Sequence, residues 1–226
     1  NSGTSQIVDT GVQVSTDKWY DMSFSADGTT AKIYVDGNLV AQETITNSFA
    51  LNDGTAQSLR IGTAFNGTSD LSDMLIDEVR VWSTARTPAQ IRDGIDQPLA
   101  GNESGLQAYY KFDDETASGV VQDKTANNHD LTLAGNARVI DDIHGAVSMD
   151  GVDDVITIAN DASLNTSSGT WSIWMKTDGD WADSGTGTAH EAILMTRSND
   201  ADSRQGLSIS LKPDGTLSVA GRDTDS

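Results

Sequence analysis

The chain has 226 residues, with 14 basic and 34 acidic side chains and a formal charge of −20. A charge of this sign repels polyanions and excludes nucleic acid as a partner. The absence of cysteine excludes disulfides, thiolate-bound zinc and a thiol nucleophile, and no apolar run is long enough for membrane insertion. Of the acidic residues, 29 are aspartate, a preference typical of loops and of calcium ligands.

Short strands separated by tight turns are the predicted elements along most of the chain. Seven Asp-Gly pairs and one Asn-Gly pair are turn signals. Between them, apolar and polar residues alternate with the period of a strand that has one buried face. The clearest alternations are Tyr20, Met22 and Phe24; Ala31, Ile33 and Val35; Leu207, Ile209 and Leu211; and Leu217 and Val219.

One short helix is predicted over residues 88–94. Thr87 is a suitable N-cap, Pro88 occupies the first helical position, and Gln90 completes a capping box with Thr87. We expect Gly94 to end this helix.

A connector at residues 96–105 has no periodicity and divides the chain into residues 1–95 and 106–226. Many short strands on both sides of it predict an all-β fold, an antiparallel sandwich of two sheets or a jelly roll. A fold of alternating strands and helices is excluded.

Each piece contains several segments that resemble segments of one protein family. A single segment would be a weak match, but the order of the segments within each piece is specific. Residues 1–95 contain KWYDMSFSADGTTAKIYVDGNLVAQ, LRIGTAFNG and LIDEVRVWSTARTPAQI. Residues 106–226 contain GLQAYYKFDDE, NNHDLTLAGN, GAVSMDGVDDVITI and GTWSIWMKTD. The first set resembles the second half of a laminin G-like, concanavalin A-type jelly roll, and the second set resembles its first half.

The two pieces stand in reversed order relative to that family. Either residues 1–226 form one laminin G-like domain in permuted order, or the chain spans the end of one domain and the start of the next in a tandem array. Each piece alone would expose half of a hydrophobic core and open sheet edges. We therefore expect the pieces to close into one sandwich, within the chain or by half-domain exchange with a neighbouring copy.

Asp77 is the most informative candidate metal ligand. In LIDEVRVW it has the strand parity of Leu75, Val79 and Val81, so a regular strand would place its carboxylate on an apolar face. Burial of an unpaired carboxylate is costly and calls for a cation. In the resembled family a structural Ca²⁺ commonly bridges the first and last strands, and Asp77 matches the last-strand position. The alternatives are a β-bulge that turns Asp77 outward and an ion pair with Arg80.

A second candidate calcium site is the cluster of Asp150, Asp153 and Asp154 around a glycine turn. Ca²⁺ takes six to eight oxygen ligands, so this loop would supply only part of the shell. The alternative is a set of solvated turn aspartates. Residues 199–202 form a further acidic loop that could bind calcium or sugar.

The predicted ligand-binding residues lie in two loops that combine an aromatic ring with polar side chains. Sugar sites commonly stack a ring on the pyranose while polar groups bind the hydroxyls. The alternative for the first loop is a tryptophan that covers the edge of its own core. The candidates are Trp181, Asp180, Asp183 and His190 in the first loop, and Phe65 and Asn66 in the second.

The remaining tryptophans are expected to be structural. Trp171 shares strand parity with apolar neighbours, and Trp19 and Trp82 occupy framework positions of the resembled family, so all three are expected in the core. Trp174 has the opposite parity and is expected to cover the second face of its sheet.

No catalytic constellation is found in the sequence. Retaining glycoside hydrolases use two carboxylates about 5 Å apart, whereas Asp77 and Glu78 would point to opposite faces of a regular strand. The three histidines are far apart, and neither a G-x-S-x-G elbow nor a glycine-rich phosphate loop is present. We therefore expect that the protein is not an enzyme.

The resemblance implies a non-catalytic extracellular carbohydrate-binding or adhesion module with Ca²⁺ as its structural cofactor. Its expected partner is carbohydrate or another extracellular ligand. The alternatives are a structural spacer domain of a large repetitive adhesin and an accessory domain of a secreted polysaccharide-degrading enzyme. The acidic composition, rich in Asp, Gly, Thr and Ser, favours a secreted or cell-surface location in a bacterium.

Overall fold

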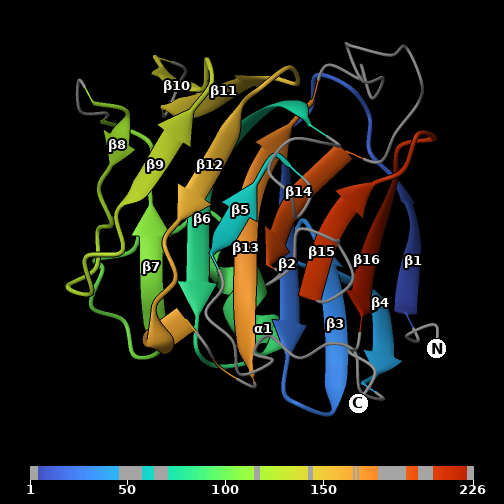
Figure 1. Cartoon of the computed structure of the whole chain (residues 1–226). Helices are drawn as coiled ribbons and strands as arrows, with labels where there is room; N and C mark the ends of the chain where they lie inside the picture. Colours follow the sequence, from blue (N-terminus) through green and yellow to red (C-terminus); the bar gives the residue numbers. More distant parts are fainter. Residues whose placement is uncertain are drawn as a thin grey trace.

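Two antiparallel β-sheets pack face to face in the computed structural model, with one α-helix outside the second sheet (Figure 1). The predicted all-β sandwich with one short helix is confirmed. The structure describes residues 5–45, 58–63, 71–114, 118–141, 145–164, 166, 168–177, 192–197 and 206–222.

The first sheet has the spatial order β1-β16-β15-β14-β5-β12-β9-β8. Its strands are β1 (Ser5–Gln13), β5 (Leu59–Ile61), β8 (Val120–Val121), β9 (Leu131–Ala134), β12 (Val155–Ile158), β14 (Ala192–Arg197), β15 (Gly206–Leu211) and β16 (Thr216–Arg222). A 3-10 turn at Ala162–Leu164 follows β12.

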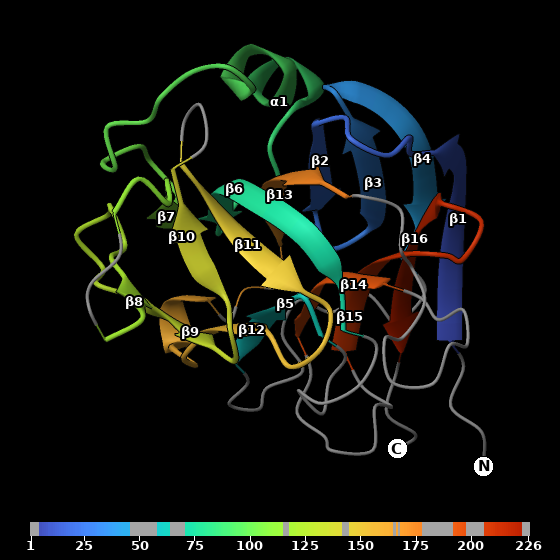
Figure 2. The same ribbon diagram turned by 90° about the horizontal axis from the view of Figure 1, so that it is seen from above.

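The second sheet has the order β10-β11-β6-β13-β2-β3-β4, and β7 pairs with β6 as well. Its strands are β2 (Tyr20–Ala26), β3 (Thr30–Val35), β4 (Asn38–Thr44), β6 (Asp73–Trp82), β7 (Leu106–Tyr110), β10 (Arg138–Ile140), β11 (Ala146–Asp150) and β13 (Gly169–Lys176). Seen from above, this sheet lies between the first sheet and helix α1 (Figure 2).

Both sheets combine strands from residues 1–95 and 106–226. In the second sheet, β13 lies between β6 and β2. In the first sheet, β5 lies between β14 and β12. Strand β1 pairs with β16, with Ser5 opposite Arg222, so strands near the two chain ends are neighbours. Neither piece completes either sheet without the other.

The main hydrophobic core fills the space between the two sheets. Phe24 of β2 packs near Trp171 of β13, with ring centroids 6.5 Å apart, as the strand parity predicted for Trp171. Ile156, Leu194 and Val219 of the first sheet are fully buried in the same cluster. Burial of such apolar side chains from both sheets is the main stabilising contribution to a sandwich of this kind.

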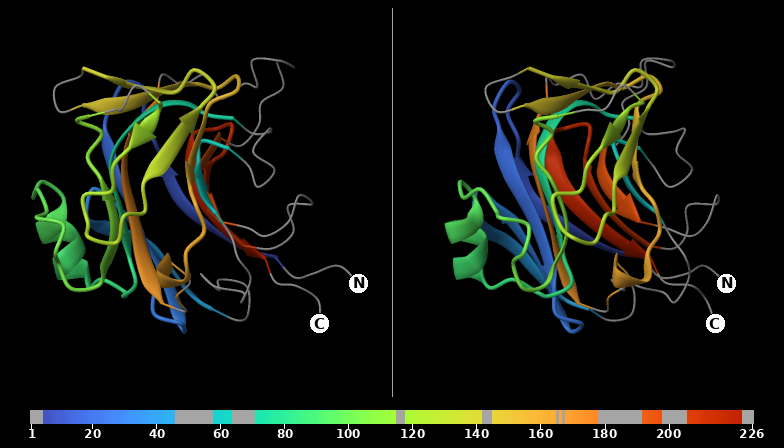
Figure 3. Two further views of the ribbon diagram at one scale, coloured as in Figure 1. Left: turned by 60° about the vertical axis from the view of Figure 1, so that its left-hand side comes forward. Right: turned by 90° about the vertical axis from the view of Figure 1, so that its left-hand side faces the viewer.

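Strand β2 is buried on both faces, which the alternating pattern did not predict. Its polar residues Asp21, Ser23 and Ser25 point away from the core, yet each is at least 96% buried. Helix α1 (Pro88–Gly94) and the residues around it cover this outer face (Figure 3). The helix therefore buries part of the outer face of the second sheet, which would otherwise be exposed to solvent.

Helix α1 begins as predicted. The Thr87 hydroxyl accepts the Gln90 N–H at 3.2 Å, and the Gln90 side-chain oxygen accepts the Thr87 N–H at 2.9 Å. This reciprocal pair satisfies two backbone donors that the first turn would leave unpaired. The helix ends at Gly94, and Ile95 after it keeps helical backbone angles, so no left-handed glycine cap is present.

The interleaved strands predict that residues 1–95 do not fold alone. Without β13, both β2 and β6 lose a hydrogen-bonded neighbour and half of the core is exposed. We expect residues 1–95 to show little amide protection in hydrogen exchange, and protection to appear when residues 96–226 are added. A stably protected 1–95 fragment would contradict the shared sheets.

Candidate functional site

An open groove of about 1130 Å³ lies on the outer face of the second sheet. Its lining comes from β6 and β13, from the segment before β2, from the connector after α1, and from residues around β7 and β10. The groove therefore collects side chains from six parts of the sequence. Its chemistry depends on which side chains each strand turns outward.

A β-bulge in β6 determines which of its side chains face the groove. Asp77 pairs with Trp174 and Arg80 pairs with Ser172, so the two residues between them on β6 oppose one residue on β13. Glu78 in the bulge has a positive φ of 50°, an uncommon conformation for a residue with a side chain. The extra residue reverses the alternation of β6 from this point on.

The bulge overturns the predicted position of Asp77. Met74 and Ile76 face the core before the bulge, and Val79 and Val81 face it afterwards. Asp77 consequently lies on the outer face, beside the groove, and not on the apolar face that a regular strand would give it. The structure therefore contains the outward bulge that the sequence left open as an alternative, and it does not test whether Asp77 binds calcium.

Glu78 also lines the groove. The expectation that Asp77 and Glu78 point to opposite faces of the strand is therefore wrong, because the bulge places both carboxylates at the groove. The Glu78 carboxylate accepts the Tyr109 hydroxyl at 2.8 Å and forms an ion pair with Arg80. Both Glu78 and Arg80 are largely shielded from solvent. Hydrogen bonds to charged groups at such positions are among the stronger ones in proteins.

Arg80 connects this strand to the end of helix α1. Its guanidinium donates to the carbonyl oxygen of Gly94 at 2.6 Å and to that of Gln97 at 3.1 Å. The carbonyl groups at a helix C-terminus carry partial negative charge and are favourable partners for a cation. The Arg80 side chain thereby holds one wall of the groove against the sheet.

Asp77 is in an environment that favours its protonated form. Burial raises the pKa of Asp77 to about 7, and the negative charges of Glu78 and Asp113 act in the same direction. The hydrogen bond from the Glu78 backbone N–H and the charge of Lys111 oppose this shift. Lys111 itself forms an ion pair with Asp113 at 2.8 Å.

Two partly exposed tryptophans line the same groove. Trp174 is the cross-strand neighbour of Asp77 on one side and of Asp21 on the other. Trp19 lies just before β2, and the Lys176 ammonium is 5.7 Å from its ring centroid. The prediction that Trp19 belongs to the core is wrong, because it faces the groove; the prediction that Trp174 covers the second sheet face is confirmed.

Trp82 is buried, but not in the main core. It packs with Leu106 and Tyr109 in a second cluster, and the Arg86 guanidinium lies 4.0 Å from its ring centroid. Its cross-strand partner Thr170 is on the outer face of β13. The second sheet thus carries a small apolar cluster outside the sandwich as well as the groove.

Asp96 and Asp141 add two exposed carboxylates to the groove. Asp96 lies in the connector after α1, and Asp141 follows β10. Sequence reasoning missed both because nothing local distinguishes them from other loop aspartates. For Trp174, in contrast, its parity opposite to that of the core residues was a usable signal.

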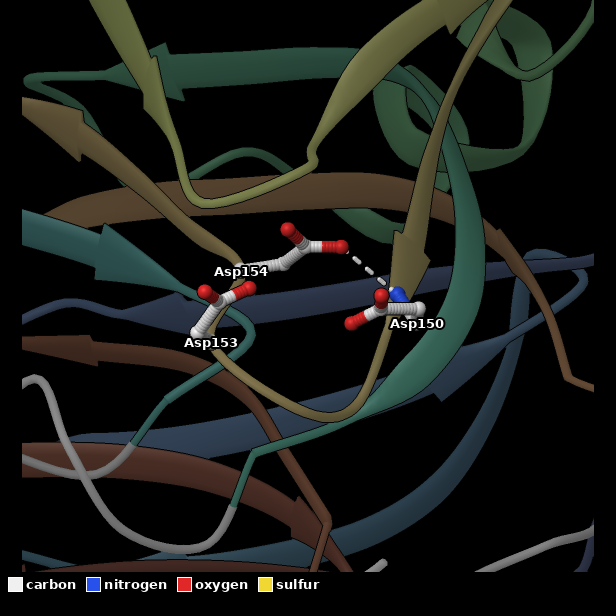
Figure 4. A group of neighbouring side chains, drawn as sticks. All are labelled: Asp150, Asp153 and Asp154. Atoms are coloured by element: carbon white, nitrogen blue, oxygen red, sulfur yellow. Dashed lines mark hydrogen bonds between the residues drawn. The ribbon is translucent and has the colours of Figure 1, made fainter.

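The three aspartates of the predicted calcium cluster do come together. Asp150, Asp153 and Asp154 each offer a carboxylate oxygen within 4.8 Å of the others, at the turn between β11 and β12 (Figure 4). Asp150 and Asp153 are exposed, whereas Asp154 is 1% exposed. Among the residues that the structure describes, this is the one group of at least three such side chains with converging ligand atoms.

Asp154 also has a structural role. Its carboxylate accepts the backbone N–H of Asp150 at 2.7 Å and that of Asn136, so it connects the β11–β12 turn to the turn after β9. Burial raises the pKa of Asp154, and these backbone hydrogen bonds oppose the shift. Cation binding would use the remaining lone pairs together with the freer oxygens of Asp150 and Asp153, which is chemically suitable for part of a calcium shell.

The loop residues predicted to bind ligand lie outside the described part of the chain. This holds for Trp181, Asp180, Asp183 and His190, and also for Phe65 and Asn66. It holds equally for the acidic loop at residues 199–202. Their roles stay predictions.

Comparison with known proteins finds a family match within the first piece of the chain. Residues 1–92 match the model of the concanavalin A-like lectin/glucanases superfamily, which confirms the resemblance recognised in residues 1–95. No curated protein matches the chain. The family supports a carbohydrate-binding or adhesion-type module in general. Within the described residues, no helix has the length and apolar character needed to span a membrane.

Asp21 gives a testable pH dependence. It is 3% exposed, and burial raises its pKa to about 7, while its hydrogen bond from Ser23 and the charge of Arg80 oppose the shift. The native state therefore retains a proton that the unfolded chain releases at lower pH. Stability is fully present below the unfolded pKa of 3.8 and is lost as pH rises through about 7.

We expect Asp21→Asn to be more stable than wild type at about pH 8 and to have a much smaller advantage at about pH 5. Between the two pH values the advantage should grow by on the order of 3 kcal/mol, because the amide keeps an acceptor for Ser23 without a buried charge. Urea unfolding at both pH values measures it, with the exposed Glu43→Gln as a matched control. Equal differences at both pH values would contradict the assignment.

Proposed function

We propose that this protein is a non-catalytic module that binds carbohydrate in the groove on the outer face of its second sheet. The observation that carries the proposal is the pair Trp19 and Trp174, both partly exposed, in one groove with several carboxylates. An indole ring offers an apolar surface to the C–H face of a pyranose, and carboxylates accept hydrogen bonds from its hydroxyls. The match to a superfamily of lectins and glucanases supports the same ligand class.

The contacts of Glu78 support the non-catalytic part of this proposal. A retaining hydrolase needs one carboxylate free to attack the sugar and a second to act as acid. Glu78 is instead held by Arg80 and Tyr109, an arrangement that favours a positioning role for this side chain. Asp77, with its raised pKa, would then serve as a hydrogen-bonding group for ligand hydroxyls.

We further propose that the protein acts outside the cell, as an adhesion or accessory module. Laminin G-like domains are typically extracellular, and the acidic composition supports solubility in such a setting. A spacer domain of a large adhesin is the alternative, and it requires no ligand in the groove. One domain in permuted order is the proposed organisation, supported by the strands that alternate between the two pieces in both sheets.

Calcium is proposed as a stabilising ion at Asp150, Asp153 and Asp154. The converging carboxylate oxygens support this, and a bound ion would hold the β11–β12 turn that Asp154 already connects to the turn after β9. Asp77 does not belong to this group of described residues. Its predicted part in a calcium site at the last strand stays untested.

Trp174→Ala tests the carbohydrate proposal. We expect loss of binding to the glycans that the wild-type protein retains on a glycan array, because removal of the ring deletes about 1 kcal/mol or more of stacking together with buried apolar area. Trp174→Phe should keep part of the affinity. Circular dichroism checks that both variants keep the fold.

Two results would contradict the groove as the site. If Trp181→Ala abolishes binding while Trp174→Ala does not, the ligand binds at the predicted loop instead. If wild-type protein retains no glycan at all, the spacer function is favoured. Release of reducing ends from a bound glycan would contradict the non-catalytic part of the proposal.

Calorimetry in Ca²⁺ and in chelator tests the proposed ion. At a free Ca²⁺ concentration of about 100 times its dissociation constant, binding adds about 2.7 kcal/mol to stability and raises Tm. We expect Asp153→Asn to abolish this increase and leave the Tm in chelator unchanged, since Asp153 is exposed. Asp154→Asn should lower the Tm even in chelator, because Asp154 is buried against two backbone amides. A wild-type Tm that is equal in Ca²⁺ and chelator would remove the ion from the proposal.

A further inference from the structure

The groove is acidic, although one basic side chain lies at its edge and one of its acids is largely protonated. The Lys176 ammonium lies 5.7 Å from the ring centroid of Trp19 in the lining, and burial raises the pKa of Asp77 to about 7. Five carboxylates line it, against the two basic side chains Arg80 and Lys111. Both bases already have acidic partners, since Arg80 pairs with Glu78 and Lys111 pairs with Asp113. The charge that a ligand meets is therefore determined by the remaining acids and by Lys176 beside Trp19.

Asp96 and Asp141 are the exposed members of that remainder. Neither forms an ion pair with another residue of the described chain. They come from separate segments, the connector after α1 and the residues after β10, so the negative charge is contributed from more than one part of the lining. The overall charge of −20 reinforces the same sign.

This charge pattern distinguishes between classes of saccharide. A uronic acid or a sulfated sugar would bring a like charge into the groove, which is unfavourable in a partly desolvated site. A neutral sugar would shield the carboxylates from water without neutralising them. A sugar with a free ammonium group would place a positive charge near them while its ring still stacks on an indole.

The tryptophans are compatible with a cation in the same place. The Lys176 ammonium already lies 5.7 Å from the centroid of the Trp19 ring, within the range of a cation–π contact. An indole face is therefore able to accept either the apolar face of a pyranose or a neighbouring ammonium group. Lysine-rich peptides could use the charge, but they have no pyranose ring to stack on Trp174.

We propose that the groove is selective for saccharides with free, protonated amino groups over their N-acetylated and anionic counterparts. The ligand class is an oligomer of an unsubstituted amino sugar. This inference rests on the proposed carbohydrate function and adds to it the charge of the ligand.

A matched pair of trisaccharides tests the charge directly. The trimer of glucosamine and the trimer of N-acetylglucosamine differ only by the acetyl groups that remove the charge. We expect isothermal titration at about pH 6, where the amine is protonated, to show binding of the glucosamine trimer about tenfold tighter or more. The preference should shrink as salt is raised, because salt screens exposed charges.

Single substitutions of exposed residues test which carboxylates cause the preference for the glucosamine trimer. We expect Asp96→Asn and Asp141→Asn each to weaken glucosamine binding about fivefold and to change binding of the acetylated trimer less than about twofold. The matched control is Glu43→Gln, an exposed acid on β4, three strands from β13 in the sheet order; it should leave both affinities unchanged. Trp174→Ala should weaken binding of both trimers.

The possible failures are distinguishable. If both trimers bind equally and Trp174→Ala weakens both, the carbohydrate function holds and charge selectivity is overturned. If neither trimer binds, or if Trp174→Ala has no effect on either, the groove as a saccharide site is overturned and the selectivity with it. If trilysine binds as tightly as the glucosamine trimer, the groove recognises cations without regard to the sugar ring, which also overturns the inference.

Discussion

The pairing of β6 with β13, interrupted by the bulge at Glu78, is the constraint on which the rest of the structure depends. Before the bulge, Ile76 faces the core and Asp77 faces outward. After it, Val79 faces the core and Arg80 faces outward. Without the extra residue, one half of the strand would turn its apolar side chains to the outer face, because successive strand residues point to opposite sides.

Arg80 connects strand β6 to the end of helix α1 and so forms one wall of the groove. Its guanidinium holds the end of helix α1 through the carbonyl groups of Gly94 and Gln97 and also pairs with Glu78. The helix and connector thereby cover part of the outer face and leave the rest as a groove. Burial of Asp21 under this cover and exposure of Trp174 in the groove follow from the same packing.

Local sequence signals predicted the elements whose causes are local. The helix at residues 88–94 was recognisable because its capping box involves Thr87 and Gln90, three residues apart. The convergence of Asp150, Asp153 and Asp154 was recognisable because a single turn contains all three. The sandwich itself followed from many short alternating strands, whose apolar faces have to be buried against another sheet.

The sequence by itself determined the fold class, the capped helix, the acidic turn and the candidate residues within each loop, because each of these depends on neighbours along the chain. Only the tertiary structure decided that Asp77 faces outward, that β2 is buried on both faces, and that Trp19, Asp96 and Asp141 line the same groove. Those outcomes depend on pairing and packing between segments far apart in sequence. A single inserted residue in a strand changes which face a side chain occupies while leaving its local pattern almost unchanged.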